Sequence, residues 1–211
     1  MNFLITGANS GLGFEIFKIL SRDLKNNFFI ISRNNKNLKS YKKIKFYKGN
    51  LNANENIKKI AKRIIQDSSN KIDVIICNAA EGTFGSVHKV NINDFQKNLN
   101  TNFFSHLILI KSILPSMIAK NKGHIINIAS GTGIYGFKNS ASYSLGKSSM
   151  QILIETIYEE NYQNNIYAKN IFPGLTKTDF TKKNKYIGKK NKFKLKGKDK
   201  KLIAEIITNN I

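Results

Sequence analysis

Short apolar segments alternate with longer helical patterns along almost the whole 211-residue chain. Residues 74–77 and 125–128 are nearly continuous in apolar side chains, as strands are when helices cover both faces of their sheet. Expected strands occupy 2–6, 28–32, 44–47, 72–77, 124–129 and 166–172, and expected helices occupy 11–22, 54–67, 91–121, 141–161 and 200–208. This β-α-β rhythm predicts one α/β domain, residues 1–211, built on a doubly wound parallel sheet with helices on both faces.

Three segments depart from that rhythm. Residues 34–43 are short and polar, so we expect a reduced or irregular crossover helix there. Residues 91–121 are too long for a typical single helix, and Asn100-Thr101-Asn102 is the expected break. No strand pattern follows the last helix, so a closing C-terminal strand is expected to be missing.

The formal net charge of +22 would suit an acidic partner such as nucleic acid, a membrane surface or an anionic substrate. Nearly all the basic residues are lysines, and Asn and Ile also abound, which is typical of a proteome-wide compositional bias. Only residues 182–201 concentrate the charge, with eleven lysines against the single acid Asp199. The sequence lacks the aromatic interleaving and arginine readout of specific nucleic-acid recognition, although non-specific binding at low salt is an alternative.

Cysteine and histidine content argues against a metal centre. The single cysteine, Cys77, allows no intramolecular disulfide, so we expect a cytoplasmic protein. Cys77 lies in an expected strand and should be packed, while His88, His106 and His124 have no metal-ligand spacing and are expected at the surface or in loops. We expect no signal peptide and no membrane span.

A glycine-rich turn, residues 6–13, joins the first expected strand to the first helix. Glycines at such a turn let backbone amides approach a pyrophosphate, which the helix N-terminus also attracts. A glycine trio alone is often a plain turn, but its position directly after strand one predicts a dinucleotide site.

Tyr143 and Lys147 lie four residues apart at the start of the expected helix 141–161. Residues with this spacing share one helix face, so the ammonium can lie beside the phenol and lower its pKa from about 10 towards neutrality. A core tyrosine and a surface lysine would give the same spacing by accident. Together with the glycine turn, however, the pair indicates a general acid/base.

The Gly-x-x-x-Gly-x-Gly spacing and the Tyr-x-x-x-Lys helix resemble the short-chain dehydrogenase/reductase family over residues 2 to about 180. The resemblance implies a Rossmann fold, an NAD(P) cofactor, and reduction of a carbonyl or the reverse oxidation of an alcohol. Tyr143 would be the acid/base, Ser130 would bond the substrate carbonyl, Lys147 would lower the Tyr143 pKa and bond the nicotinamide ribose, and Asn102 would hold a relay water.

The same resemblance places the cofactor. Residues 77–80 match the family's Asn-Ala-Gly stretch with Ala80 in place of glycine, and an added methyl there could tighten the approach of the backbone to the cofactor. Residues 173–178 match the loop that binds the nicotinamide carboxamide, and residues 50–51 stand where the family often has Asp-Leu. The implied cofactor contacts are Gly7, Asn9, Ser10, Gly11, Leu12, Gly13, Ser32, Arg33, Asn50, Leu51, Asn78, Ala79, Ala80, Tyr143, Lys147, Pro173, Gly174, Thr176 and Thr178.

Residues 30–33, Ile-Ile-Ser-Arg, end the second expected strand without an acid. An acid there would bind the ribose 2′-hydroxyl of NAD, whereas Ser32 and Arg33 suit the 2′-phosphate of NADP, which an arginine can grip with two bonds. A solvated surface arginine is the alternative. We expect NADP(H) to be preferred over NAD(H).

The loop after strand six covers the substrate in this family, and here it leads into the lysine-rich region 182–201. A cationic lid suggests an anionic small-molecule substrate, such as a nucleotide sugar, an acyl group on acyl carrier protein or a phosphorylated metabolite. The resemblance also implies a homodimer or homotetramer built on helices 103–121 and 141–161. The alternative function is a non-catalytic NADP-binding redox sensor or interaction module, which would not need an acid/base set.

Overall fold

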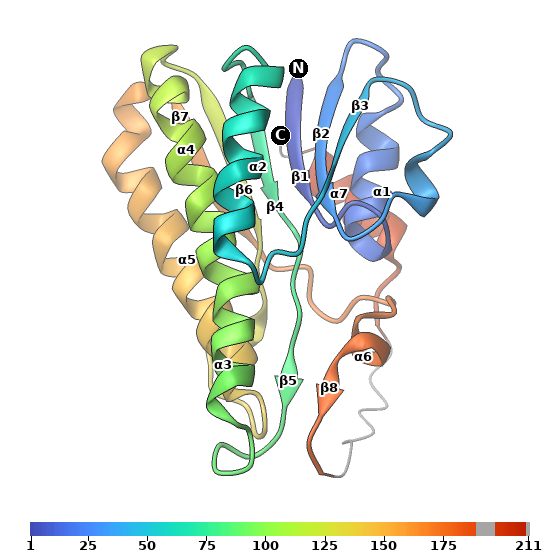
Figure 1. The fold of residues 1–211 in the computed structure, drawn as a ribbon, viewed down its shortest axis with the longest axis vertical. Helices are drawn as coiled ribbons and strands as arrows, with labels where there is room; N and C mark the ends of the chain where they lie inside the picture. Colours follow the sequence, from blue (N-terminus) through green and yellow to red (C-terminus); the bar gives the residue numbers. More distant parts are fainter. Residues whose placement is uncertain (189–196, 210–211) are drawn as a thin grey trace.

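The structure is a computed structural model that describes residues 1–188 and 197–209. Its centre is a six-stranded parallel sheet with strands in the order β3-β2-β1-β4-β6-β7, flanked by helices on both faces (Figure 1). The strands are β1 (Asn2–Thr6), β2 (Asn27–Ser32), β3 (Ile44–Lys48), β4 (Val74–Cys77), β6 (Gly123–Ile128) and β7 (Ile166–Ile171). This arrangement confirms the doubly wound α/β fold. Within the described residues, β7 is the outer strand on its side of the sheet.

The helices follow the expected pattern closely. They are α1 (Gly11–Leu20), α2 (Asn54–Asp67), α3 (Ile92–Leu99), α4 (Ser105–Ala119), α5 (Ala141–Asn161), α6 (Phe180–Lys183) and α7 (Lys200–Thr208). The polar segment 34–43 contains a single 3₁₀ turn, η1 (Lys36–Leu38), as its composition predicts. Further 3₁₀ turns are η3 (Gly131–Gly133) and η4 (Tyr162–Asn164).

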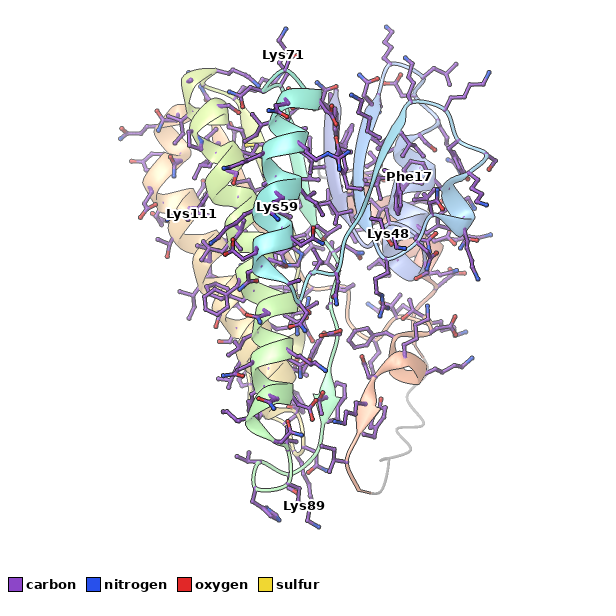
Figure 2. All side chains as sticks on the ribbon, in the orientation of Figure 1. Phe17, Lys48, Lys59, Lys71, Lys89 and Lys111 are labelled. Carbon is purple, nitrogen blue, oxygen red and sulfur yellow. The ribbon has the colours of Figure 1, made fainter. Side chains whose placement is uncertain are left out.

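Two hydrophobic layers lie on opposite faces of the sheet because successive strand residues point to opposite sides. Leu4, Ile31 and Ile75 face α2, α4 and α5 in one layer. In the other, Phe3 and Ile30 face α1 and α7. Figure 2 shows Phe17 inside this second layer, whereas Lys59, Lys71, Lys89 and Lys111 project outwards from widely separated parts of the surface. The scatter of these four lysines is what a compositional bias predicts.

The long helical segment 91–121 is irregular at the predicted place, but the chain does not leave the helix there. It continues through a π-helical turn, η2 (Asn100–Phe104), between α3 and α4. The expected break is therefore a widened turn, a feature that proteins often place at functional sites.

The stretch Ile92–Ala119 is long and apolar enough, by length and composition alone, to cross a membrane. Core helices pass the same test. Here the apolar residues Leu109, Ile110, Ile113 and Met117 are buried in the core layer beneath α2 and α5. We therefore attribute the apolar character of this stretch to packing inside the fold.

Two short strands that the sequence analysis missed, β5 (Thr83–Phe84) and β8 (Lys185–Tyr186), pair in parallel outside the main sheet. Figure 1 shows them with α6 beyond the carboxyl ends of the main strands. Their pairing places the first part of the lysine-rich region beside the segment that follows β4. Residues 189–196 of that region lie outside the described residues.

Candidate active site

The carboxyl ends of β1, β4 and β6 lie at one edge of the sheet, at Thr6, Cys77 and Ile128. The strand order reverses between β1 and β4. In doubly wound sheets this reversal opens a crevice in which ligands bind. The predicted site residues Gly7, Asn78 and Ser130 follow these strands, so the topology brings them to this crevice.

The glycine turn after β1 has the backbone that its sequence predicts. Gly7 and Gly11 adopt φ angles of +70° and +62°, which side chains other than glycine strongly disfavour. A Cβ on Gly13 would lie 2.3 Å from the Nδ2 atom of Asn78 and 2.7 Å from the carbonyl oxygen of Gly7. Since Ser10 caps α1 without a side-chain hydrogen bond, its hydroxyl leaves the amides of the first turn unsatisfied. The turn therefore fits the pyrophosphate of a dinucleotide.

The loop after β4 is held against this turn. Asn78 donates from Nδ2 to the carbonyl oxygens of Thr6, at 3.0 Å, and Gly7, at 3.2 Å. The backbone amides of Asn78 and Ala79 both donate to the Thr6 hydroxyl at 3.0 Å. Ala80, which replaces the family's glycine, is half-buried beside them.

A second group of contacts joins the glycine turn to the segment after β2. Asn9 donates to the Oδ1 atom of Asn34 at 2.5 Å and accepts at its carbonyl from Asn37 at 2.8 Å. Ser32 is half-buried at the end of β2, and Arg33 is exposed beside it. The Arg33 guanidinium, predicted to bind a 2′-phosphate, is therefore exposed to solvent just after β2.

Two other predicted cofactor contacts lie after β3. Asn50 is exposed and accepts from the Asn52 amide at 3.2 Å, whereas Leu51 is buried in the core layer. The Leu51 side chain therefore serves packing. The Asn50 side-chain amide is exposed just after the carboxyl end of β3.

Residues of the loop after β7 reach the glycine turn from the other side. Pro173 is the second residue after β7, Gly174 adopts a φ of +66°, and Thr176 donates to the Gly174 carbonyl at 3.3 Å. The Thr178 methyl lies 3.7 Å from where a Cβ on Gly11 would be. The predicted carboxamide-binding segment is accordingly next to the turn.

Three of the four predicted catalytic residues come together where α5 begins. Tyr143, in the first turn of α5, is 8% exposed. The Ser130 hydroxyl, just after β6, lies 3.0 Å from the Thr132 hydroxyl and is near enough to the phenol to lower its pKa. Lys147 is buried one turn further on, and its ammonium lies 6.0 Å from the centre of the Tyr143 ring. Its Nζ atom donates to the Ile128 carbonyl at 2.7 Å.

The electrostatics of this trio differ from the sequence prediction. Burial raises the pKa of Tyr143 to about 12, and the nearby Ser130 hydroxyl only partly opposes this. Burial lowers the pKa of Lys147 to about 8. The predicted lowering of the Tyr143 pKa by Lys147 is not found, because the ammonium bonds a backbone carbonyl instead of the phenol. Near neutral pH the phenol is protonated and able to donate.

Asn102 lies in the π-helical turn and is 1% exposed. Its side-chain amide is engaged twice with Glu81, donating from Nδ2 to the Glu81 carbonyl at 2.8 Å and accepting at Oδ1 from the Glu81 amide at 2.9 Å. A Cβ on Gly146 would lie 2.8 Å from that of Asn102, so α5 packs closely here. The side chain thus fixes the loop after β4 beside the residue that precedes Lys147.

His106 is a functional candidate that the sequence analysis placed wrongly. It is 2% exposed on the inner face of α4, whereas a surface or loop position was expected. His88 is exposed and His124 is half-buried on β6. The helix spacing of His106 with Leu109, Ile110 and Ile113 was the signal that could have revealed its burial.

An aromatic wall, which we define as Phe84, Phe180 and Tyr186, also escaped the sequence analysis. The rings of Phe84 and Phe180 each lie 5.5 Å from the Tyr143 ring, and Tyr186 stacks on Phe84 at 5.4 Å. Backbone bonds from Lys185 to Gly82, at 3.1 Å, and from Ile187 to Phe84, at 2.8 Å, hold the wall closed.

The described residues offer neither a reactive thiol nor a metal centre. Cys77 is buried, and its burial raises the pKa of the thiol to about 12, as a packed cysteine requires. In residues 1–188 and 197–209, no three His, Cys, Asp or Glu side chains gather where they could hold a metal ion.

Comparisons with known proteins agree with this geometry. The family model described as short chain dehydrogenase matches residues 2–186. The 3-oxoacyl-[acyl-carrier-protein] reductase FabG of Rickettsia prowazekii is 31% identical over 188 residues, which cover 85% of this chain and 74% of that relative.

Solved structures share the fold. A short-chain dehydrogenase from Streptomyces avermitilis superposes with a TM-score of 0.87 at 20% identity, covering 98% of this chain and 81% of that one. An alcohol dehydrogenase from the archaeon Thermococcus sibiricus, complexed with 5-hydroxy-NADP, gives 0.83 at 19% identity over 99% and 89% of the two chains. Other solved neighbours hold NADPH or NAD+.

Proposed function

The chain belongs to the short-chain dehydrogenase family of oxidoreductases, and on that premise we propose that it is an NADP-dependent enzyme that reduces a carbonyl to an alcohol or catalyses the reverse oxidation. The observation that carries the proposal is the convergence of Ser130, Tyr143 and Lys147 beside a glycine turn that fits a dinucleotide. The alternative, a non-catalytic redox sensor, is not favoured because it would not need this acid/base set.

The division of labour follows from the geometry. When bound, the nicotinamide supplies or accepts the hydride. The Ser130 hydroxyl donates to the substrate oxygen, and Tyr143, protonated at neutral pH, gives its proton to the developing alkoxide. With the cofactor bound, Lys147 would bond the nicotinamide ribose in place of the Ile128 carbonyl and would lower the pKa of Tyr143, so that the phenol would release its proton more easily. The relay water at Asn102 stays a prediction, since both polar atoms of the Asn102 side-chain amide are engaged with Glu81.

Cofactor preference is tested by thermal unfolding with NADPH and NADH in parallel. A ligand that binds only the native state raises stability by RT ln(1 + [L]/Kd), so the measurement needs no substrate. We expect NADPH to raise Tm more than NADH does. Because Arg33 would bond the 2′-phosphate, Arg33→Ala should weaken NADPH binding about tenfold and leave NADH binding unchanged.

Arg22→Ala is the matched control for this titration, since Arg22 is also exposed but follows α1 at its far end. Equal shifts with NADPH and NADH, together with an unchanged response of Arg33→Ala, would refute the NADP preference. A shift with neither cofactor would refute the proposed cofactor site itself.

Three lysines of the lysine-rich region 182–201 form ion pairs, which weakens the case for an anionic substrate. Lys185 pairs with Asp94 at 2.7 Å, Lys182 with Asp179 at 3.2 Å, and Lys200 with Glu15 at 3.1 Å. Each of these three lysines already has an acidic partner, and the groups next to Tyr143 are the rings of the aromatic wall. We propose a small-molecule substrate that is apolar beside its carbonyl. An anionic group further from the carbonyl stays a prediction, as does the cytoplasmic location.

A homodimer or homotetramer remains our proposal for the assembly. The outer face of α5 exposes Leu145 and Ile152, which are 51% and 62% exposed and seven residues apart on one face. Ile152→Lys would place a charge in an interface built on this helix, so we expect the oligomer to dissociate, with its mass measured by sedimentation. Leu24→Lys, at a residue 79% exposed and remote from α5, should change nothing. An unchanged mass for Ile152→Lys would exclude this face.

A further inference from the structure

His106 joins two parts of the site through both of its ring nitrogens. Its Nε2 atom lies 3.0 Å from the hydroxyl of Thr6, the last residue of β1, and its Nδ1 atom lies 3.4 Å from the carbonyl oxygen of Asn102 in the π-helical turn. Because the side chain is 2% exposed, these contacts have little competition from water.

Counting protons at Thr6 fixes the tautomer of His106. A hydroxyl has two lone pairs and one proton. The amides of Asn78 and Ala79 take both lone pairs, so the hydroxyl must donate. The nearer acceptor is Nε2 at 3.0 Å, since the alternative, the Ile76 carbonyl, lies at 3.4 Å. Nε2 therefore carries no proton, and the Nδ1 proton is donated to Asn102.

We propose that His106 is a positioning residue for the proposed reaction: its neutral imidazole couples the loop that grips the cofactor to the turn that carries the proton relay. The Thr6 end orients the hydroxyl that holds Asn78 and Ala79 on the glycine turn. The Asn102 end steadies a turn that holds Glu81 and packs against α5 beside Lys147. The inference rests on the proposed function only for its effect on turnover.

The surroundings of His106 keep the imidazole neutral. Burial and the nearby Lys147 ammonium hold the pKa of His106 at about 4. An imidazolium would donate from both nitrogens and face the lone pairs of a Thr6 hydroxyl that are already occupied. The neutral form is the one that satisfies all the partners.

Two conservative substitutions separate the two bonds. A glutamine side chain reaches the Nε2 position, so His106→Gln can still accept from Thr6 but loses the donor to Asn102. An asparagine reaches the Nδ1 position, so His106→Asn keeps that donor and loses the acceptor for Thr6. We expect His106→Asn to weaken NADPH binding about fivefold with kcat largely retained. We expect His106→Gln to lower kcat about fivefold with NADPH binding largely retained. Each change is on the scale of one neutral hydrogen bond.

The controls use measurements that a purely structural role would not move. His88→Gln, at an exposed loop residue, should match the wild type in kcat, KM and NADPH affinity. The proposal would be overturned if both His106 variants lost the same Tm and neither NADPH affinity nor kcat differed between them. If neither variant folds, Thr6→Ser should retain NADPH affinity and Thr6→Val should lose it, and equal affinities would overturn the proposal.

Nitrogen-15 NMR of the wild-type protein tests the tautomer independently of any activity. The expected spectrum shows His106 neutral with its proton on Nδ1 between about pH 6 and 8. A proton on Nε2, or a charged ring, would overturn the coupling. Absence of carbonyl reduction in the wild type would refute the proposed function while leaving the tautomer and the NADPH affinities to decide the coupling.

Discussion

Tyr143→Phe is expected to lower kcat by about 10²- to 10⁴-fold, the range that one general acid/base contributes. Phenylalanine keeps the ring that packs against Phe84 and Phe180, each 5.5 Å away, so the local structure should persist. Only the hydroxyl that meets Ser130 is lost. The measurement is single-turnover oxidation of NADPH with a carbonyl substrate, alongside the Tm shift that NADPH produces.

The NADPH-induced Tm shift should stay near the wild-type value, because no atom of the glycine turn has changed. Tyr167→Phe, at a residue 45% exposed on β7, is the matched control and should retain wild-type turnover. Turnover in Tyr143→Phe above a tenth of the wild-type rate would exclude Tyr143 as the acid/base. A lost Tm shift would instead mean that the hydroxyl supports the cofactor site.

Periodic segments were predictable because their pattern reports local burial. The bounds of α2 and α5 agree with the sequence prediction, and so do the polar crossover after β2 and the place of the irregular turn in the helix at Asn100. The predicted residues Gly7, Asn78 and Ser130 lie near one another because they follow strand ends, which a doubly wound topology gathers at one edge of the sheet. Their roles stay predictions.

Features that depend on distant residues were not predictable. The strands β5 and β8 are each two residues long, too short to show the alternation of apolar and polar residues that indicates a strand. They also lie about 100 positions apart, so their pairing has no local signal. Their pairing brings the aromatic wall onto Tyr143, and the resulting burial raises a pKa that sequence spacing alone predicted to fall. The burial of His106 could have been read from its helix spacing, but its role depends on its distant partner Thr6.

Gly13→Ala is expected to abolish most cofactor binding, with NADPH affinity falling about 10- to 100-fold. In an ordinary helix this change would stabilise the protein by roughly 0.5–1 kcal/mol. Here the new Cβ would lie 2.3 Å from the Nδ2 atom of Asn78, which cannot withdraw without losing its bonds to the Thr6 and Gly7 carbonyls. Overpacking of this kind costs about 1–3 kcal/mol, so the steric term wins and the loop that carries Ala79 is displaced from the turn.

The double variant Gly13→Ala with Asn78→Ala distinguishes two effects: the steric contact with the Asn78 amide, and the loss of the hydrogen bonds from Asn78 to the Thr6 and Gly7 carbonyls. Removing the amide relieves the contact with Asn78 but leaves the one with the Gly7 carbonyl oxygen at 2.7 Å, so Tm should recover only in part. The loop after β4 still lacks the hydrogen bonds of Asn78, so NADPH affinity should remain low. Gly136→Ala is the control, since a Cβ there meets no atom within 4 Å. Wild-type affinity in Gly13→Ala would show that the loop after β4 can shift without disturbing the cofactor. In that case the bonds from Asn78 would serve only the fold, and the link from His106 through Thr6 would have no route to the cofactor.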